Sequence, residues 1–382
     1  MKILHLIYTT GVAGAEKHLL YLLPALKKFD VHCELLLICP KRNIDDLRQY
    51  CEGLNERGIM TTLFPVKSRM FYLTASKKIF RYLKSCGIGI VHSHLFSADF
   101  IAVLIKKLYF RDVIIFSTKH GYEEKYLVQY GLGNKKVRYN LYYFLSKVII
   151  KITDHNVAVS QALSEMYYFL KLSATRMKYI HHGICLNASS AQAEVKGEPI
   201  IIIVGRLYTI KGHNYLFQAL PEIIEKFPEL KLLVLGEGPL RDELIKQATA
   251  LNVNHHIEFV GFAPPAKYIH RCQLMVVPSL FESFGLVYIE SFALKIPVVA
   301  FDVEAGNQII ENNKTGILVP RGNIDMLSKA IIRLLQSPNQ RKIIVENAYT
   351  KYLSNYTVER MAKETAEWYF SILNDKQFSR SF

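Results

Sequence analysis

The sequence is defined first by what it does not contain. No run of 18 or more apolar residues occurs among the 382 residues, so we expect no transmembrane helix, although half of the residues are hydrophobic. The six cysteines form no C-x-x-C pair, and their spacing indicates neither a zinc site nor a disulfide framework. No Asp-x-Asp triplet is present to hold a divalent metal. We therefore expect reduced thiols and no metal site.

Two further features are missing at the start of the chain. Gly11 and Gly14 follow the first apolar run but do not form a G-x-G-x-x-G fingerprint, which disfavours a dinucleotide site there. That apolar run is short and is interrupted by His5, so it indicates a first buried strand rather than a signal peptide.

Positive charge is abundant but unevenly distributed. Residues 1–195 contain 27 Lys and Arg against 14 Asp and Glu, whereas residues 196–382 contain 21 against 19. A strongly basic half indicates an anionic partner, which could be a membrane surface, a nucleic acid or an acidic substrate. General solubility is the alternative. No recognised nucleic-acid module occurs, so nucleic-acid binding is kept only as a minor hypothesis and no nucleic-acid partner is expected.

Short apolar runs alternate with helical periodicity along both halves of the chain, and the length favours two domains. This pattern predicts an α/β protein with two Rossmann-like parallel-sheet domains. We expect a first domain at 1–187, a linker at 188–198, a second domain at 199–355 and a C-terminal helix within 356–382. That helix is expected to cross back to the first domain through Trp368 and Tyr369, with an ordinary terminal helix as the alternative.

The segment 278–290 is the strongest candidate site. It follows an apolar run at 274–277, which predicts a buried strand, and it precedes a stretch with helical periodicity. Ligands of open α/β sheets bind at this kind of strand-to-helix junction. The first amides of a helix carry partial positive charge, so Ser283, Phe284 and Gly285 are expected to face an anion.

Two glutamates belong to the same segment. Glu282 precedes the predicted helix, and Glu290 lies about five residues into it, roughly 7.5 Å along the axis. Carboxylates accept the hydrogen bonds that sugar hydroxyls donate. A sugar nucleotide, with hydroxyls at both ends and a diphosphate between them, fits this layout. Two solvated charges on a helix surface are the alternative.

A basic loop supplies the complementary charge. Arg206 and Lys211 lie five positions apart after the apolar run at 199–204. Arginine grips phosphate oxygens in a fork and lysine supplies a point charge, so the two can converge on one diphosphate. A basic loop without a ligand is the alternative.

The first half contains weaker candidates. Gly14 lies in a turn between a predicted strand and a predicted helix, where a phosphate could approach closely, and His120 follows the apolar run at 113–117. His92 and His94 have spacing that would suit a metal, but no third ligand is adjacent. A polar strand end is therefore the favoured interpretation of these two histidines.

Taken together, these motifs resemble the retaining glycosyltransferases of the GT-B fold, glycosyltransferase family 4, also called the group 1 family. The pair Glu282 and Glu290 is similar to the family's E-x7-E signature, and the loop from Gly205 to Gly212 is similar to its Gly-Arg…Lys-Gly motif. The resemblance covers nearly the whole chain and is most specific in residues 200–320. One departure is His182, which stands where the family usually has asparagine.

The resemblance implies roles for individual residues. It implies that Glu290 binds the ribose, that Glu282 binds the sugar and that His120 contacts or orients that sugar. The expected catalytic residues are His120, Arg206, Lys211 and Glu282. The expected donor-binding residues are Gly14, Gly205, Arg206, Lys211, Glu282, Ser283, Phe284, Gly285, Leu286 and Glu290.

The implied activity is transfer of a hexosyl unit from a nucleotide-diphosphate sugar, with retention of configuration, across a central cleft of a GT-B fold. UDP-sugar is favoured over GDP-sugar as the donor substrate, and no metal or other cofactor is expected. The acceptor is expected to be a saccharide or a lipid-linked saccharide in bacterial cell-surface polysaccharide or lipopolysaccharide synthesis. A sugar-nucleotide epimerase or a phosphorylase on the same fold is the alternative.

Residues 122–152 suggest a place for such an enzyme in the cell. Basic residues alternate there with aromatic and aliphatic ones, which is typical of a helix that lies in a bilayer interface. A buried helix with lysines at its ends is the alternative. We expect a cytoplasmic protein, with peripheral attachment to an anionic inner-membrane surface as the accompanying hypothesis.

Overall fold

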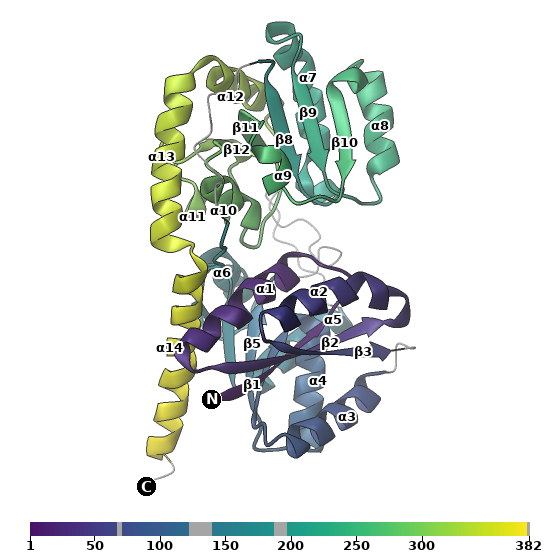
Figure 1. Ribbon diagram of the computed structural model, residues 1–382, viewed down its shortest axis with the longest axis vertical. Helices are drawn as coiled ribbons and strands as arrows, with labels where there is room; N and C mark the ends of the chain where they lie inside the picture. The colour runs from purple at the N-terminus through teal and green to yellow at the C-terminus, as the bar shows by residue number, and fades with distance from the viewer. Residues whose placement is uncertain (67–70, 122–139, 187–196, 380–382) are drawn as a thin grey trace. The chain divides into compact units, whose positions relative to one another are not determined.

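A computed structural model describes residues 1–66, 71–121, 140–186 and 197–379 (Figure 1). The described residues form two compact units, and the chain enters the first unit twice. The first unit contains residues 1–66, 71–121, 140–183 and 357–379, and the second contains 184–186 and 197–356. Each unit is described below by itself.

The first unit is built on a seven-stranded parallel sheet with the order β3-β2-β1-β4-β5-β6-β7. Apolar residues fill these strands because both faces of a parallel sheet are covered by helices. The strands are β1 (Lys2–Tyr8), β2 (His32–Pro40), β3 (Met60–Val66), β4 (Ile90–His94), β5 (Ile114–Lys119), β6 (His155–Ala158) and β7 (Lys178–Tyr179).

Alternate residues of β1 point to opposite faces of this sheet, as expected for a strand. Ile3 and Ile7 pack in a core with α1, α2 and α14, whereas Leu4 and Leu6 pack in a second core with α3 and α4. The helices of this unit are α1 (Gly14–Leu26), α2 (Ile44–Glu56), α3 (Phe71–Ser85), α4 (Leu95–Leu108), α5 (Leu141–Ile152), α6 (Gln161–Phe169) and α14 (Val358–Ser379), with the short 3-10 helices η1 (Lys27–Phe29) and η2 (Lys41–Asn43).

The C-terminal helix α14 belongs to this first core although it comes last in the chain. Trp368 and Tyr369 are buried, and both rings meet the ring of Phe116 edge-on at 5.0 Å. Met361 and Ala362 complete the buried side of the helix. The helix therefore closes one face of the first sheet.

The second unit has a six-stranded parallel sheet with the order β10-β9-β8-β11-β12-β13. Its strands are β8 (Ile200–Val204), β9 (Lys231–Leu235), β10 (Ile257–Gly261), β11 (Leu274–Val277), β12 (Val298–Phe301) and β13 (Ile317–Val319). Its helices are α7 (His213–Lys226), α8 (Arg241–Ala250), α9 (Ala266–Ile269), α10 (Leu286–Ala293), α11 (Gly306–Ile309), α12 (Ile324–Gln336) and α13 (Pro338–Asn355), with η4 (Thr209–Lys211) and η5 (Asn254–His256).

The strand order of each sheet reverses once. In the first sheet the reversal lies between β1 and β4, and in the second it lies between β8 and β11. Ligands of open α/β sheets bind at such a reversal, in the crevice outside the carboxyl ends of the strands. The predicted fold class, two parallel-sheet α/β units, is confirmed.

Two expectations can be followed only in part. Residues 122–139 of the proposed membrane segment lie outside the described residues, and so does most of the proposed linker at 188–198. Within the part of the chain that the structure describes, no helix is both long enough and apolar enough to cross a membrane.

Candidate functional site

The second unit brings two of the predicted loops together. One loop follows β8 and the other follows β11, on either side of the point where the strand order reverses. The backbone amide of Leu280 in the second loop donates a hydrogen bond to the carbonyl of Ile210 in the first, at 2.8 Å. Residues that are about 70 positions apart in sequence therefore share one edge of the sheet.

An ion pair joins the same loops. The ammonium nitrogen of Lys211 lies 2.6 Å from Oε1 of Glu282, and the hydroxyl of Ser279 donates to that oxygen at 2.8 Å. The Glu282 side chain is only 9% exposed and that of Lys211 is 21% exposed. The sequence analysis assigned Lys211 to the diphosphate and Glu282 to the sugar of a ligand. In the structure the two side chains form an ion pair and neutralise each other.

Glycines allow the close approach of these loops. Gly212 has φ +69°, and a Cβ at this position would lie 1.8 Å from the carbonyl oxygen of Pro278. Gly285 has φ +88°, and a Cβ there would lie 2.3 Å from the ring of Tyr288. Only glycine adopts such dihedral angles without strain and also leaves this space.

The helix after the second loop begins at Leu286, one residue after the last amide that the sequence argument assigned to the anion. Gly285 is the N-cap of α10, because its left-handed conformation is incompatible with the helix, and the first helical residue is Leu286. Ser283 and Phe284 therefore precede the cap, and the first helical amides belong to Leu286 and Val287. Glu290 is the fifth residue of α10, as predicted, and it is buried.

The remaining residues of the basic loop lie around Lys211. The Lys211 side chain passes close to Gly205, at 3.6 Å from the position that a Cβ would take. Arg206 is exposed, and its guanidinium lies over the ring of Tyr208 at 5.0 Å.

Two buried polar side chains near these loops were missed by the sequence argument. His213 begins α7, is 2% exposed, and has no hydrogen-bond partner for either ring nitrogen among the described residues. Burial, and then the nearby Lys211, lowers the pKa of His213 to about 4. The Tyr288 hydroxyl is also buried without a partner there, and burial followed by Glu282 raises its pKa well above the ordinary value. Both resemble ordinary helix residues in sequence, so no signal marked them.

In the first unit, the predicted residues Gly14 and His120 lie after β1 and β5. Gly14 is exposed at the first position of α1. The carboxylate of Glu16 turns back and accepts a hydrogen bond from the amide of Ala13 at 2.8 Å, which fixes the turn before the helix. His120 is partly exposed and directly follows Lys119, the last residue of β5.

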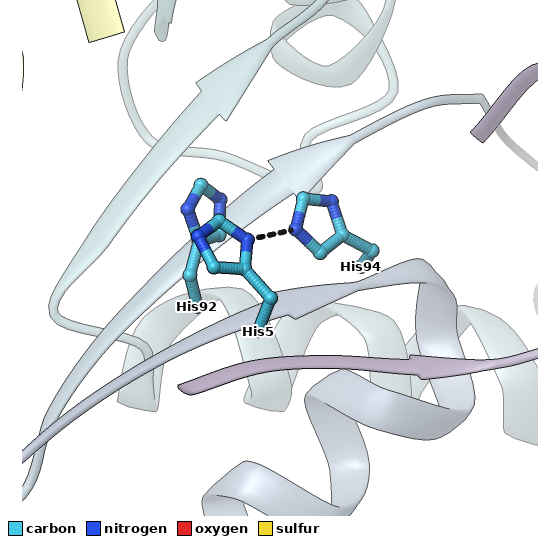
Figure 2. Close-up of side chains that lie close together, drawn as sticks. All are labelled: His5, His92 and His94. Atoms are coloured by element: carbon cyan, nitrogen blue, oxygen red, sulfur yellow. Dashed lines mark hydrogen bonds between the residues drawn. The ribbon is translucent and has the colours of Figure 1, made fainter. Parts of the chain in front are cut away.

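A cluster of histidines surrounds His120. No third ligand is adjacent to His92 and His94 in the sequence, but the fold brings His5 to the same place, as Figure 2 shows. His5 Nδ1 lies 3.0 Å from His94 Nε2, and His94 Nδ1 lies 3.0 Å from His120 Nε2. The rings of the cluster come from β1, α1 and β4 and from the segments that follow β5 and β7: His5, His18, His92, His94, His120 and His182.

The outer members of the cluster have their own partners. His92 Nδ1 contacts the hydroxyl of Tyr369, and His92 Nε2 lies 2.8 Å from the hydroxyl of Thr118. His182 Nδ1 lies 2.7 Å from His18 Nδ1, so one of these rings donates and the other accepts. The sequence could not predict this arrangement, because strand order decides which histidines meet.

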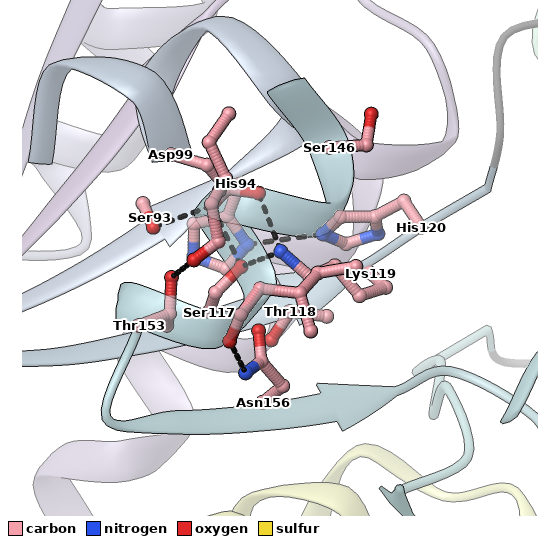
Figure 3. Close-up of polar contacts among 12 residues, drawn as sticks. Ser93, His94, Asp99, Ser117, Thr118, Lys119, His120, Ser146, Thr153 and Asn156 are labelled. Carbon is pink, nitrogen blue, oxygen red and sulfur yellow. Dashed lines mark hydrogen bonds and ion pairs between the residues drawn. The ribbon is translucent and has the colours of Figure 1, made fainter. Parts of the chain in front are cut away.

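A buried ion pair supports the end of β5, as Figure 3 shows. The ammonium of Lys119 lies 2.6 Å from Oδ2 of Asp99, and both side chains are about 5% exposed or less. The hydroxyls of Ser93 and Ser117 each donate to Oδ1 of Asp99 at 2.6 Å. Such complete pairing compensates the desolvation of both charges and holds the backbone that leads to His120.

Two parallel-sheet units, with paired loops at the strand reversal of the second, define the protein as one of the GT-B class. The chain belongs to glycosyltransferase family 4, the group 1 glycosyltransferases: a model described as "Glycosyltransferase Family 4" matches residues 12–188, and one described as "Glycosyl transferases group 1" matches residues 187–351.

Individual relatives show how far the likeness extends. An uncharacterized glycosyltransferase of Methanocaldococcus jannaschii is 35% identical over 45% of this chain and 45% of its own length, so the chain spans about half the length of this first relative. A Campylobacter jejuni transferase, "N-acetylgalactosamine-N,N'-diacetylbacillosaminyl-diphospho-undecaprenol 4-alpha-N-acetylgalactosaminyltransferase", is 26% identical over 90% of this chain and 93% of its own. The crystal structure of Anabaena HepE in complex with UDP and glucose has TM-score 0.79 and 19% identity, with 97% of this chain and 100% of that chain covered.

Proposed function

We propose that this protein transfers a hexosyl unit from a nucleotide-diphosphate sugar to a saccharide or lipid-linked acceptor, with retention of configuration at the anomeric carbon. The observation that carries the proposal is the pairing of Lys211 with Glu282 across two loops at the strand reversal of the second unit. A cationic group therefore lies beside a carboxylate that can accept hydrogen bonds from sugar hydroxyls. Family membership supplies the class of reaction.

In this proposal the donor's diphosphate takes the place of Glu282 as the partner of Lys211. Arg206, exposed on the same loop, adds a second positive group, and the first amides of α10 add the partial charge of a helix N-terminus. Glu282, released from Lys211, accepts hydrogen bonds from the sugar. Glu290, one turn into α10, is assigned to the ribose hydroxyls.

The same positive groups serve the chemistry. As the bond between the anomeric carbon and the phosphate oxygen breaks, negative charge grows on the leaving diphosphate, and fixed cations and amides stabilise it. The acceptor hydroxyl oxygen then attacks from the face that the leaving group has vacated, which retains the configuration, and the hydroxyl proton passes to the departing diphosphate. UDP-sugar is the favoured donor, which agrees with the UDP and glucose in the HepE complex.

A product assay tests the reaction class directly. The purified chain is incubated with UDP-hexoses and with saccharide or polyprenyl-diphosphate-linked saccharide acceptors, and the products are analysed by mass spectrometry and NMR. A new α-linked product from an α-linked donor is expected. Release of an altered sugar without an acceptor would identify an epimerase instead, and a sugar phosphate formed from inorganic phosphate would identify a phosphorylase.

The metal-independent part of the proposal has its own test. After treatment with a chelator and gel filtration, turnover is expected to continue at its full rate. A rate that is lost on chelation and restored by added manganese would contradict the proposed role of Arg206 and Lys211 as the only stabilising cations.

We also propose that α5 attaches the first unit to an anionic membrane surface, where a lipid-linked acceptor would be found. Leu141, Phe144 and Val148 lie on one face of this helix, and each is more than half exposed. Lys147 and Lys151 are exposed beside them. Apolar side chains flanked by lysines suit the interface of an anionic bilayer.

Vesicle flotation tests this attachment. The protein is expected to float with vesicles that contain anionic lipid and to remain unbound with neutral vesicles. Leu141→Ser/Phe144→Ser should abolish flotation, while Ile343→Ser, which changes an exposed apolar side chain of the second unit, should leave it unchanged. Equal flotation of the α5 double variant and of Ile343→Ser would show that α5 does not attach the protein to the membrane.

A further inference from the structure

Three histidines of the first unit bring ring nitrogens close enough together to share one metal ion. One ring nitrogen each of His18, His94 and His120 lies within 4.8 Å of the other two. His18 is on α1, His94 ends β4 and His120 follows β5, so the fold gathers them from separate elements. All three belong to the first unit, and the group needs no residue of the second.

The spacing of these nitrogens suits a tetrahedral ion. Zinc binds imidazole nitrogens at about 2.0–2.1 Å, so two ligand nitrogens of a tetrahedral site lie roughly 3.4 Å apart. His94 Nδ1 and His120 Nε2 face each other at 3.0 Å (Figure 3) and need to separate by only about 0.4 Å. No pair of the three ligand atoms needs to close by more than about 1.4 Å. The χ2 torsion of histidine has a broad energy minimum, so ring rotations supply shifts of this size.

Two of the three rings are already oriented through their second nitrogen. A histidine that binds a metal normally has its other ring nitrogen held by a hydrogen bond, which fixes the direction of the ring. His18 Nδ1 lies 2.7 Å from His182 Nδ1, and His94 Nε2 lies 3.0 Å from His5 Nδ1 (Figure 2). These contacts leave His18 Nε2 and His94 Nδ1 as the nitrogens for the ion.

The nitrogen that His18 would offer has no other partner. His18 is 5% exposed, and its Nε2 is buried without a hydrogen bond among the described residues. Buried polar side chains normally find a partner, so an unsatisfied one requires an explanation. A metal ion is a partner for the lone pair of a neutral imidazole.

A hydrogen bond between His94 and His120 is the competing interpretation of their contact. A single hydrogen lies between the two facing nitrogens, and it belongs to one of the two rings. When an ion binds, both nitrogens direct lone pairs at it, and this hydrogen moves to the other nitrogen of its own ring. Metal binding therefore exchanges one hydrogen bond for two metal–nitrogen bonds and releases no proton from this pair.

The donor atoms select the kind of ion. Among the described residues, both groups with metal-binding geometry consist of histidines alone. Imidazole suits Zn²⁺, Cu²⁺ and Ni²⁺, whereas Mg²⁺, Ca²⁺ and Mn²⁺ prefer oxygen ligands. The second group, His5, His92 and His94, is less suitable. Both nitrogens of His92 already contact hydroxyls, those of Tyr369 and Thr118.

We propose that His18, His94 and His120 bind one divalent transition-metal ion of the zinc class, with a water molecule as the fourth ligand. The ion ties α1 to the carboxyl ends of β4 and β5. The sequence analysis expected no metal site, because these ligands become adjacent only in the fold. The inference does not depend on the proposed function, since the ion has no assigned part in sugar transfer.

Zinc binding to the full chain tests the proposal. The protein is purified without a metal-affinity tag, dialysed against a chelator and then against metal-free buffer, and titrated with Zn²⁺ in competition with a chromophoric chelator. We expect one Zn²⁺ per chain and a higher melting temperature of the zinc-bound protein. Co²⁺ should give the visible absorption of a tetrahedral ion with nitrogen ligands, without the charge-transfer band of a thiolate.

Substitutions locate the bound ion. His94→Ala and His120→Ala should each abolish stoichiometric binding, with circular dichroism to confirm the fold. His120 is partly exposed, so His120→Ala keeps the test decisive if His94→Ala does not fold. His5→Leu removes the partner of His94 and should weaken Zn²⁺ binding about 10–100-fold. His255→Gln, which removes an exposed ring beside His256 in the second unit, is the matched control and should bind as the wild type does.

Three results would overturn the inference. They are no stoichiometric Zn²⁺ in the wild-type chain, equal binding in His94→Ala and His120→Ala, and loss of binding in His255→Gln, which would identify an adventitious surface site. None of these measurements uses turnover, so failure of the transferase assay is distinguishable from failure of the metal site.

Discussion

The Lys211 ammonium and the Glu282 carboxylate lie 2.6 Å apart although 71 positions separate them in the chain. The contact exists because β8 and β11 are neighbours, so that the loops after them meet at one edge of the sheet. The ion pair neutralises two charges in a largely buried position. In the proposed function, binding of a diphosphate exchanges one anionic partner of Lys211 for another.

This pairing predicts the behaviour of single and double substitutions. Lys211→Met leaves the Glu282 carboxylate buried without its cation and should lower the free energy of unfolding by roughly 3 kcal/mol. Lys211→Met/Glu282→Gln should regain most of this loss, because no charge is left alone, yet remain inactive. Urea unfolding followed by circular dichroism measures both.

A matched control is Lys329→Met, which removes an exposed lysine paired with Asp325 and should leave the stability nearly unchanged. If the double variant were as unstable as Lys211→Met, the ion pair would not be the reason for the loss.

The glycines of the two loops give a second prediction. Gly285→Ala imposes a left-handed backbone on alanine and places its Cβ against the buried ring of Tyr288, and Gly212→Ala meets the carbonyl of Pro278. Each should cost about 2–3 kcal/mol and weaken nucleotide binding. Gly53→Ala, inside α2 with open space around the added methyl group, should be neutral or stabilising. Thermal unfolding with and without UDP compares the three, and equal melting temperatures would contradict the argument.

The buried histidines predict acid sensitivity of the first unit. Burial lowers the pKa of His5 and of His18 to about 3, below the ordinary value of 6.5. The folded state therefore binds fewer protons than the unfolded state, and the stability contributed above pH 6.5 is lost as the pH falls from 6.5 toward 3. Each histidine contributes a slope of up to about 1.4 kcal/mol per pH unit.

Thermal unfolding between pH 7.5 and pH 5 checks this prediction. His18→Leu should show a shallower loss of melting temperature toward pH 5 than the wild-type chain, whereas His270→Gln should follow the wild-type curve. Parallel curves for His18→Leu and the wild type would contradict this prediction, because they would show that burial does not lower the pKa of His18 in the folded chain.

The aromatic residues of α14 give a fourth prediction. Trp368 is buried against Phe116, while its near neighbour Phe370 is 38% exposed. Trp368→Ala should therefore destabilise the first unit by about 3–5 kcal/mol, and Phe370→Ala should have little effect. Denaturant unfolding of both variants is the measurement, and equal stability would mean that the contacts of Trp368 do not hold the helix in place.

Much of the fold could be predicted from the sequence because it depends on local patterns. Apolar runs such as 274–277, followed by helical periodicity, identified strands and helices in sequence order. Candidate roles for Arg206, Lys211 and Glu290 could be assigned because these residues lie in or after loops that follow recognisable strands, and those roles stay predictions.

Other features depend on which strands become neighbours. Sequence order does not reveal that His5 and His94 meet, or that Lys211 and Glu282 pair, since both contacts arise from the reversal of strand order in each sheet. The sequence also does not show the left-handed conformation of Gly285, which makes Leu286 rather than Ser283 the first residue with a helical amide. These are contacts and dihedral angles of the folded chain rather than properties of a segment.

The central claim is that the loops after β8 and β11 bind a diphosphate, and isothermal titration calorimetry with UDP and with uridine tests it most directly. In the wild-type chain UDP is expected to bind about 100-fold more tightly than uridine, since two charge-assisted contacts are each worth roughly 1.5 kcal/mol or more. In Arg206→Ala/Lys211→Ala that difference should nearly disappear while the affinity for uridine stays the same. An undiminished preference for UDP in the double variant would contradict the account.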